Sequence, residues 1–234
     1  KKLNPRIIYC SIPAYGQKGP YSKKPGYDTL GQSLSGLLSI LTDLDKPEGP
    51  GASFSDHLGG FYGAYGILAA LAARERTGKG QKVETSLLEA TISFIGFSIT
   101  QYLFSGDVPK KSRRLKTAGV YALVAGDGKP FVIHLSHPPK FWIGVTEVMG
   151  RPDLQTDPRT KDRQARVKHF DMIHEILSKV AQTAPREHWI KALEAKDVPC
   201  APINNLAEVF EDPQVQYLDR LMKVEDPEFG TFQL

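Results

Sequence analysis

Strand-like and helix-like patterns alternate along the N-terminal half of the chain. The segment RIIYCSI, residues 6–12, is almost continuously apolar, which is typical of a strand buried in a parallel sheet. A helix is predicted from about residue 56 to a stop at Gly78, a strand over 82–86 and a second helix over 87–104. Strands that alternate with helices in this way constrain the fold to an α/β domain.

A different pattern begins near Thr117. The sequence GVYALVAGDGKPFVIHLS predicts a β-hairpin whose turn contains Gly126, Asp127 and Gly128. Helices are predicted over 140–149, 165–182 and 185–196, and a short strand, a helix and a final strand follow them. We therefore expect part of a large domain over 1–116, a small α+β domain over 117–200, and a return toward the large domain over 201–234.

A long irregular segment, PAYGQKGPYSKKPGYD, follows the first strand. Its prolines and glycines exclude regular structure, and a short helix is expected after it, over 29–41. Long ordered loops usually carry a function, so this loop is a candidate part of a site.

Composition excludes several classes of protein. The chain has 234 residues, of which 41% are hydrophobic, and no apolar segment approaches the roughly 20 residues that span a bilayer. The densest basic segment, KKSRRLK over 110–116, contains no aromatic residue and is expected to be a solvated loop. With a net charge of only +4, neither nucleic acid nor a membrane is an expected partner. No signal peptide is visible, so we expect a cytoplasmic protein.

The two cysteines, Cys10 and Cys200, are isolated in the sequence. They are too few for a disulfide framework and lack the paired spacing of a zinc site, so both are expected to remain thiols. No cluster of acids and histidines has metal-ligand spacing, and we expect no metal.

The sequence GASFSDHLGG places Asp56 between small residues, just before the long predicted helix. Asp is a preferred N-cap residue because its carboxylate accepts a free backbone N–H of the first turn, and capping is the first interpretation. The second is a working carboxylate. Adjacent helix residues point in different directions, so His57 is expected to be a bystander rather than a base for Asp56.

Three ordered segments resemble the family III CoA-transferases, the CaiB/BaiF family. These segments are NPRIIYCSIPAYGQKGPYSKKPGYD, SDHLGGFYGAYGILAALAARERTGKGQKVETSLLEA and VPCAPINNLAEVFEDPQV. The resemblance implies a Rossmann-like large domain with a parallel sheet, a smaller domain, and an interlaced homodimer. It also implies that the chain, which has no initiator Met, is a fragment lacking the N-terminal part of the large domain and the C-terminal end.

The resemblance implies that Asp56 is the nucleophile of a CoA-transferase. Coenzyme A would move from an acyl-CoA to a carboxylic acid through a covalent aspartyl-CoA thioester, with the CoA thioester as a substrate and no tightly bound cofactor. Gly26, Tyr27 and Asp28 match residues that line the coenzyme or acyl site. Gly59 and Gly60 let the backbone approach a bulky thioester, and close helix packing is the equal alternative.

Two other functions remain open. Some family members are 2-methylacyl-CoA racemases or epimerases that use a His where this sequence has Tyr27 in PGYD, and tyrosine is a poor general base at neutral pH. A non-catalytic fragment that keeps the core without holding CoA is the third possibility. Some transferases also carry a run of glycines as a lid ahead of the hairpin, whereas the matching stretch here, SRRLKTAGVY, has only Gly119. The motifs do not specify the acids, because relatives use several on one fold.

Overall fold

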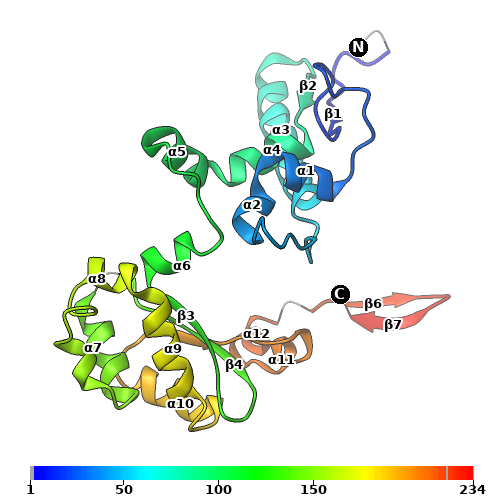
Figure 1. The fold of residues 1–234 in the computed structure, drawn as a ribbon. Coiled ribbons are helices and arrows are strands. Elements are labelled where there is room, and N and C mark those ends of the chain that lie inside the picture. The colour runs from blue at the N-terminus through cyan, green and yellow to red at the C-terminus, as the bar shows by residue number, and fades with distance from the viewer. Residues whose placement is uncertain (1–2, 137, 220, 234) are drawn as a thin grey trace. The chain divides into compact units, whose positions relative to one another are not determined.

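The computed structural model describes residues 3–136, 138–219 and 221–233. Internal contacts divide the chain into two compact units, unit 1 at Lys1–Arg113 and unit 2 at Arg114–Leu234 (Figure 1). Unit 1 contains a parallel strand pair and unit 2 an antiparallel sheet, which confirms the predicted fold class. The predicted domain boundaries at 116 and 200, and the return of 201–234 to the large domain, stay predictions.

Unit 1 is built around two parallel strands and a long helix. Tyr9 lies opposite Lys82, and Ser11 lies opposite Glu84. The Tyr9 side chain is 58% exposed, so the buried environment predicted for this strand is wrong within this chain, because a sheet of two short strands leaves its first strand open to solvent. In chain order, the elements are β1 (Tyr9–Ser11), α1 (Asp28–Ser35), α2 (Leu37–Leu41), α3 (Phe54–Thr77), β2 (Lys82–Glu84), α4 (Leu87–Phe94) and α5 (Gly96–Ser105).

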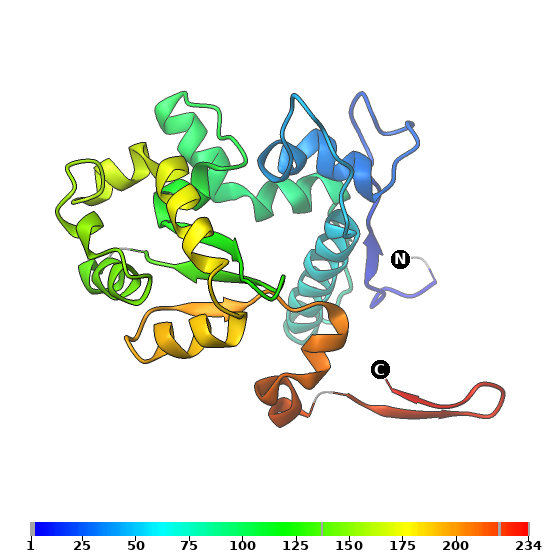
Figure 2. The same cartoon turned by 60° about the horizontal axis from the view of Figure 1, so that its bottom comes forward.

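Helix α3 lies along β1 and β2 with a glycine-lined side toward the strands (Figure 2). A Cβ atom on Gly63 would lie 2.7 Å from Ile12 Cδ1, and one on Gly66 would lie 2.5 Å from Val83 Cγ1. Neither distance leaves room for a side chain, so the missing Cβ atoms allow the helix backbone to approach the sheet closely. The C-cap is Gly78, with φ of 69°, as the sequence predicts.

The opposite side of α3 carries large apolar side chains at helical spacing. Phe61, Tyr65 and Leu68 are each at least 64% exposed. These side chains produce the apolar periodicity that predicts the helix, but they do not face the sheet.

Two predicted helices of unit 1 are each divided in two. The helix expected over 29–41 breaks at Gly36, whose φ is 88°, and the one expected over 87–104 breaks at Ile95. No single helix in the described part of the chain is long and apolar enough to cross a membrane. Helices α4 and α5 pass that test only as a pair, by length and composition, and are bent by 67°.

Unit 2 is a three-stranded antiparallel sheet with helices packed on it, in the strand order β3-β4-β5. The predicted hairpin is confirmed: Val120 pairs with His134 and Val124 with Pro130. The buried core contains Phe131 and Ile133 of the sheet together with Ile173 and Leu193 of the helices. The elements are α6 (Arg113–Ala118), β3 (Val120–Val124), β4 (Pro130–His134), α7 (Pro139–Val148), the 3-10 helix η1 (Pro152–Gln155), α8 (Arg163–Lys168), α9 (Phe170–Ala181), α10 (Arg186–Glu194), β5 (Cys200–Pro202), α11 (Leu206–Glu211), α12 (Pro213–Leu218), β6 (Lys223–Asp226) and β7 (Gly230–Gln233).

The structure corrects one prediction in the basic segment. Part of KKSRRLK is helical in α6 rather than a solvated loop. Contacts distant in sequence account for this: Lys116 Nζ pairs with Asp171 Oδ2 at 2.7 Å, and Arg163 Nη2 donates to the Thr117 carbonyl at 2.8 Å. The helix expected over 165–182 likewise divides at His169 into α8 and α9, and the final strand pairs as the β6–β7 hairpin.

The tight contact between α3 and β2 yields a stability prediction. Gly66→Ala should lower the free energy of unfolding by about 1–2 kcal/mol, because its methyl group overlaps Val83, a branched side chain with little freedom to move. The control is Gly60→Ala in the same helix, where nothing lies within 4 Å of the new methyl group. That variant should be up to about 1 kcal/mol more stable, from helix propensity. Urea unfolding of both variants tests this, and a Gly66→Ala protein as stable as Gly60→Ala would contradict the packing.

Candidate active site

The candidate site lies where the end of the irregular loop meets the start of α3. The loop turns back on itself at Gly26, where a Cβ atom would lie 2.2 Å from Ala14 Cβ and 3.1 Å from the Tyr15 ring. Any side chain at Gly26 would displace this turn. Gly26 therefore shapes the loop that leads to Tyr27 and Asp28.

Tyr27 and Asp28 start α1 in different ways from those expected. Tyr27 is the N-cap residue, its carbonyl accepts hydrogen bonds from the N–H groups of Leu30 and Gly31, and its side chain is 77% exposed. Asp28 is the first helical residue, so it does not cap α1. The phenol of Tyr27 is thus open to solvent beside the start of the helix.

Asp28 instead caps α3, a helix that begins 26 positions later in the chain, at Phe54. Its Oδ1 accepts hydrogen bonds from the backbone N–H of Ser55 at 2.7 Å and from that of Asp56 at 3.1 Å. The formal N-cap residue, Ser53, makes no side-chain capping bond. A carboxylate from another element therefore performs the task that an N-cap side chain usually performs.

Asp56 is the third residue of α3 and not its N-cap residue, so the capping interpretation of Asp56 is wrong. Its side chain is exposed, and within the described residues its carboxylate has no hydrogen-bond or ion-pair partner. A negative charge in the first turn interacts favourably with the partial positive charge of the helix N-terminus. The arrangement leaves this carboxylate accessible while its backbone is held in place.

The first-turn N–H groups of α3 are already engaged. Phe54 donates to the Ala52 carbonyl, Ser55 and Asp56 donate to Asp28, and His57 donates to the Ser53 carbonyl. His57 Nδ1 also lies 2.7 Å from the Ser53 carbonyl, which keeps the ring on its own backbone, in line with its predicted bystander role. These donors therefore do not serve an oxyanion in this arrangement.

Gly59 and Gly60 have different surroundings. Gly59 is buried, and a Cβ there would lie 2.8 Å from Leu87 Cδ2 and 3.2 Å from Ile12 Cγ2, which favours the packing interpretation for this glycine. Gly60 is exposed with open space around it, so only this glycine offers an unobstructed approach from solvent. Whether either glycine contacts a thioester stays a prediction.

Sequence reasoning missed the buried polar residues that hold Asp28 and α3. Gln32 is fully buried; its Nε2 donates to Asp28 Oδ2 at 2.5 Å and to the Ala52 carbonyl at 2.8 Å, while its Oε1 has no partner in the described residues. Ser55 is also fully buried, with Oγ 2.8 Å from Thr91 Oγ1 of α4. Their only signal in the sequence is spacing: Gln32 lies one helical turn after Asp28, the usual distance for a side-chain pair.

Other nucleophiles and ligands are not assembled here. Burial, followed by the nearby Glu194, raises the pKa of the Cys200 thiol to about 11, so this thiol is protonated at neutral pH. No group of three or more potential metal ligands occurs among the residues that the structure describes. Asp56 is thus the accessible nucleophile that the geometry supports.

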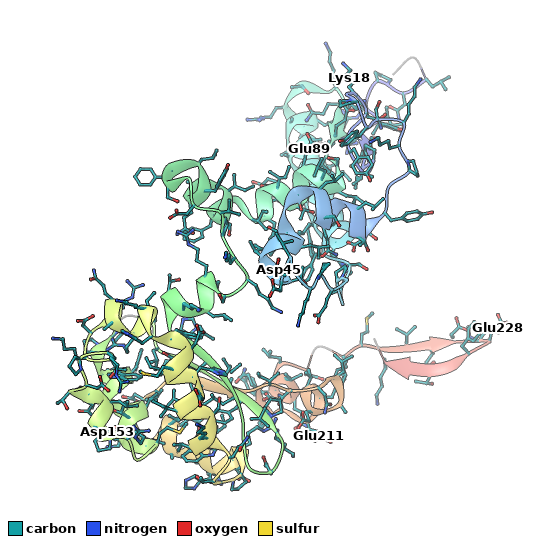
Figure 3. The ribbon with its side chains drawn as sticks, viewed as in Figure 1. Lys18, Asp45, Glu89, Asp153, Glu211 and Glu228 are labelled. Carbon is teal, nitrogen blue, oxygen red and sulfur yellow. The ribbon has the colours of Figure 1, made fainter. Side chains whose placement is uncertain are left out.

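The capping contact can be tested by removing the carboxylate. Asp28→Ala leaves the Ser55 and Asp56 N–H groups without their acceptor, and the free energy of unfolding should fall by about 1–2 kcal/mol. Asp45, labelled in Figure 3, is an exposed acid of the same unit whose carboxylate has no capping contact. Asp45→Ala should change stability by less than about 0.5 kcal/mol. Equal losses for the two variants, measured by urea unfolding, would show that Asp28 does not cap α3.

Comparisons with known proteins agree on one family. The model of CoA-transferase family III matches residues 1–234. The chain is 33% identical over 228 residues to the acetyl-CoA:oxalate CoA-transferase of Acetobacter aceti and 30% identical over 245 residues to the succinyl-CoA:glutarate CoA-transferase of Homo sapiens. These alignments cover 95% and 100% of this chain but only 58% and 53% of the relatives, so the chain spans just over half of their length.

Solved structures show the same fold. A CaiB/BaiF family protein from Brucella suis matches with a TM-score of 0.82 and 31% identity, over 96% of this chain and 59% of that protein. A protein from Mycobacterium tuberculosis matches with a TM-score of 0.84 at 23% identity, over 100% of this chain and 62% of that protein, and shares the fold.

Proposed function

This chain belongs to CoA-transferase family III, and on that premise we propose that it carries the nucleophile of an enzyme that moves coenzyme A between an acyl-CoA and a carboxylic acid. The single observation that carries the proposal is the Asp56 carboxylate: exposed, unpaired, and fixed through its own backbone N–H to Asp28. The relatives named above are CoA-transferases, which supports coenzyme A transfer at the level of the family.

The proposed reaction uses Asp56 twice in each half. An Asp56 oxygen attacks the thioester carbonyl, forming a mixed anhydride and releasing CoA thiolate. The thiolate then attacks the Asp56 carbonyl carbon, which forms the aspartyl-CoA thioester and releases the donor acid. The acceptor carboxylate reverses both steps, so a new acyl-CoA leaves and Asp56 is regenerated. The thioester bond is kept throughout, and no external energy source is required.

The neighbouring residues have proposed roles that follow from their positions. The exposed Tyr27 phenol donates a hydrogen bond to the thioester carbonyl, and Gly26 keeps the loop in the shape that presents this phenol. Asp28 positions Asp56 rather than contacting the coenzyme, because its Oδ1 is occupied by the α3 N–H groups. Gly60 provides open space beside the second turn of α3, whereas Gly59 acts through packing.

The partners and location are proposed more briefly. We propose an acyl-CoA and a small carboxylic acid as substrates and a homodimer as the assembly. The exposed apolar side chains of α3 and α5, among them Phe61, Tyr65, Phe97 and Phe104, support an interface on unit 1, because large exposed apolar patches usually mark contacts. A cytoplasmic location and the lack of a tightly bound cofactor stay predictions.

Chemical trapping tests the proposed function. The 234-residue chain and the complete natural polypeptide that contains it are incubated with acetyl-CoA, succinyl-CoA or oxalyl-CoA, reduced with borohydride and mapped by peptide mass spectrometry. We expect reduction of Asp56 that depends on acyl-CoA and that is lost in Asp56→Asn, a variant of the same size without a nucleophilic carboxylate. Asp45→Asn serves as the control.

Two results would contradict the proposal. Labelling of another carboxylate in place of Asp56 would move the nucleophile elsewhere. Absence of any label in the complete polypeptide, together with deuterium exchange at the α-carbon of a 2-methylacyl-CoA, would favour the racemase.

A further inference from the structure

Unit 2 contains a small cavity that the proposed transfer reaction does not use. Its volume is about 20 Å³, enough for one water-sized group. Residues from α6, β3, α7 and α8 and from the segment after β4 line it. The lining residues that carry the argument are Lys116, Tyr121, Ser136, Trp142, Arg163 and Arg166.

A buried donor without an acceptor lies at this cavity. Trp142 is 4% exposed, and its Nε1 has no hydrogen-bond partner among the described residues. The other tryptophan, Trp189, is equally buried, yet its Nε1 donates to the carbonyls of Ala181 at 2.8 Å and Ala184 at 3.1 Å. A buried N–H group without an acceptor is costly, so the Trp142 indole indicates an acceptor that the chain does not supply.

The side chains around the indole have an excess of positive charge. The Arg166 guanidinium lies 5.1 Å from the centre of the Trp142 ring and donates to the Thr160 carbonyl, and Arg163 donates to the Thr117 carbonyl. Neither arginine forms an ion pair with a carboxylate in the described part of the chain. Lys116 is paired with Asp171, so two cationic groups at the cavity remain without a counter-charge.

A neutral hydroxyl donor completes the lining. Tyr121 is 1% exposed, and its hydroxyl has no hydrogen-bond partner in the residues described. Burial raises the pKa of Tyr121 well above its ordinary value, so the phenol keeps its proton at neutral pH and can donate it. Ser136, at the rim, has a φ of 50°, an uncommon conformation for a residue other than glycine.

The donors and the charge together select the ligand. A water molecule would accept the indole hydrogen bond but would leave two guanidinium groups uncompensated. A metal cation is excluded by charge. An oxyanion satisfies both requirements, because its oxygens accept from neutral donors and its charge compensates arginine, which binds carboxylate and phosphate groups in a fixed geometry.

We propose that this cavity binds one oxyanion group, a carboxylate or a phosphate, with one oxygen accepting from Trp142 Nε1 and Tyr121 Oη and the charge compensated by Arg163 and Arg166. The site lies wholly within unit 2 and is independent of Asp56. It would anchor the acidic end of a small molecule or of a coenzyme.

The indole N–H resonances test this proposal directly. In an ¹⁵N-labelled 234-residue chain, the two tryptophans give two indole signals, which a Trp142→Phe protein assigns. Sodium phosphate, sodium acetate and sodium chloride are titrated separately at constant ionic strength. We expect phosphate or acetate to shift the Trp142 signal saturably while the Trp189 signal stays in place. The oxyanion that binds more tightly identifies the source of the group.

Variants distinguish the site from a general salt effect. Arg166→Gln should weaken the apparent affinity at least about tenfold, and Tyr121→Phe, which removes only the hydroxyl, should weaken it by a smaller factor. Arg159→Gln is the control, because Arg159 is exposed, pairs with Asp157 and lies outside the cavity. An unchanged Trp189 signal shows that each variant is folded. A Trp142 signal that drifts linearly and equally with all three anions, or an Arg166→Gln protein that binds as well as the parent, would overturn the proposal.

Discussion

The contact between Asp28 and the first turn of α3 is the interaction on which the candidate site depends. It joins the end of an irregular loop to the start of the helix that carries Asp56, and both oxygens of the Asp28 carboxylate are used. Because the same carboxylate accepts from the Asp56 backbone, any displacement of the loop also displaces the proposed nucleophile. Gly26, Gln32 and Ser55 support this contact from three sides through close packing and buried hydrogen bonds.

Unit 1 and unit 2 differ in how they are stabilised. Unit 2 has a continuous apolar core in which sheet and helix residues are fully buried, among them Phe131, Val145 and Leu177. Unit 1 instead relies on the close approach of α3 to two short strands, and many of its large apolar side chains face solvent. The chain spans just over half of its curated relatives, and the exposed apolar side of α3 is the kind of surface that other parts of such a protein cover.

The sequence predicts local elements well and contacts between distant elements poorly. Apolar runs and turn residues correctly indicated the parallel strand pair, the hairpin and the stop at Gly78, because these depend on neighbouring residues. The capping of α3 by Asp28 depends on a side chain from a separate segment, so local rules assigned the cap to Asp56 instead. The helix in the basic segment and the cavity beside Trp142 were missed for the same reason: their partners come from several elements.

Residue-resolved amide hydrogen exchange tests most directly whether Asp28 holds the start of α3. In the parent chain, the Ser55 and Asp56 amides should be protected, although they lie in a first turn, where helical N–H groups lack intrahelical acceptors. In Asp28→Ala, both should exchange at least about tenfold faster relative to the buried Ala70 amide of the same helix, which reports any general loss of stability. Ser55 and Asp56 amides that exchange at the same rate relative to Ala70 in both proteins would contradict the account.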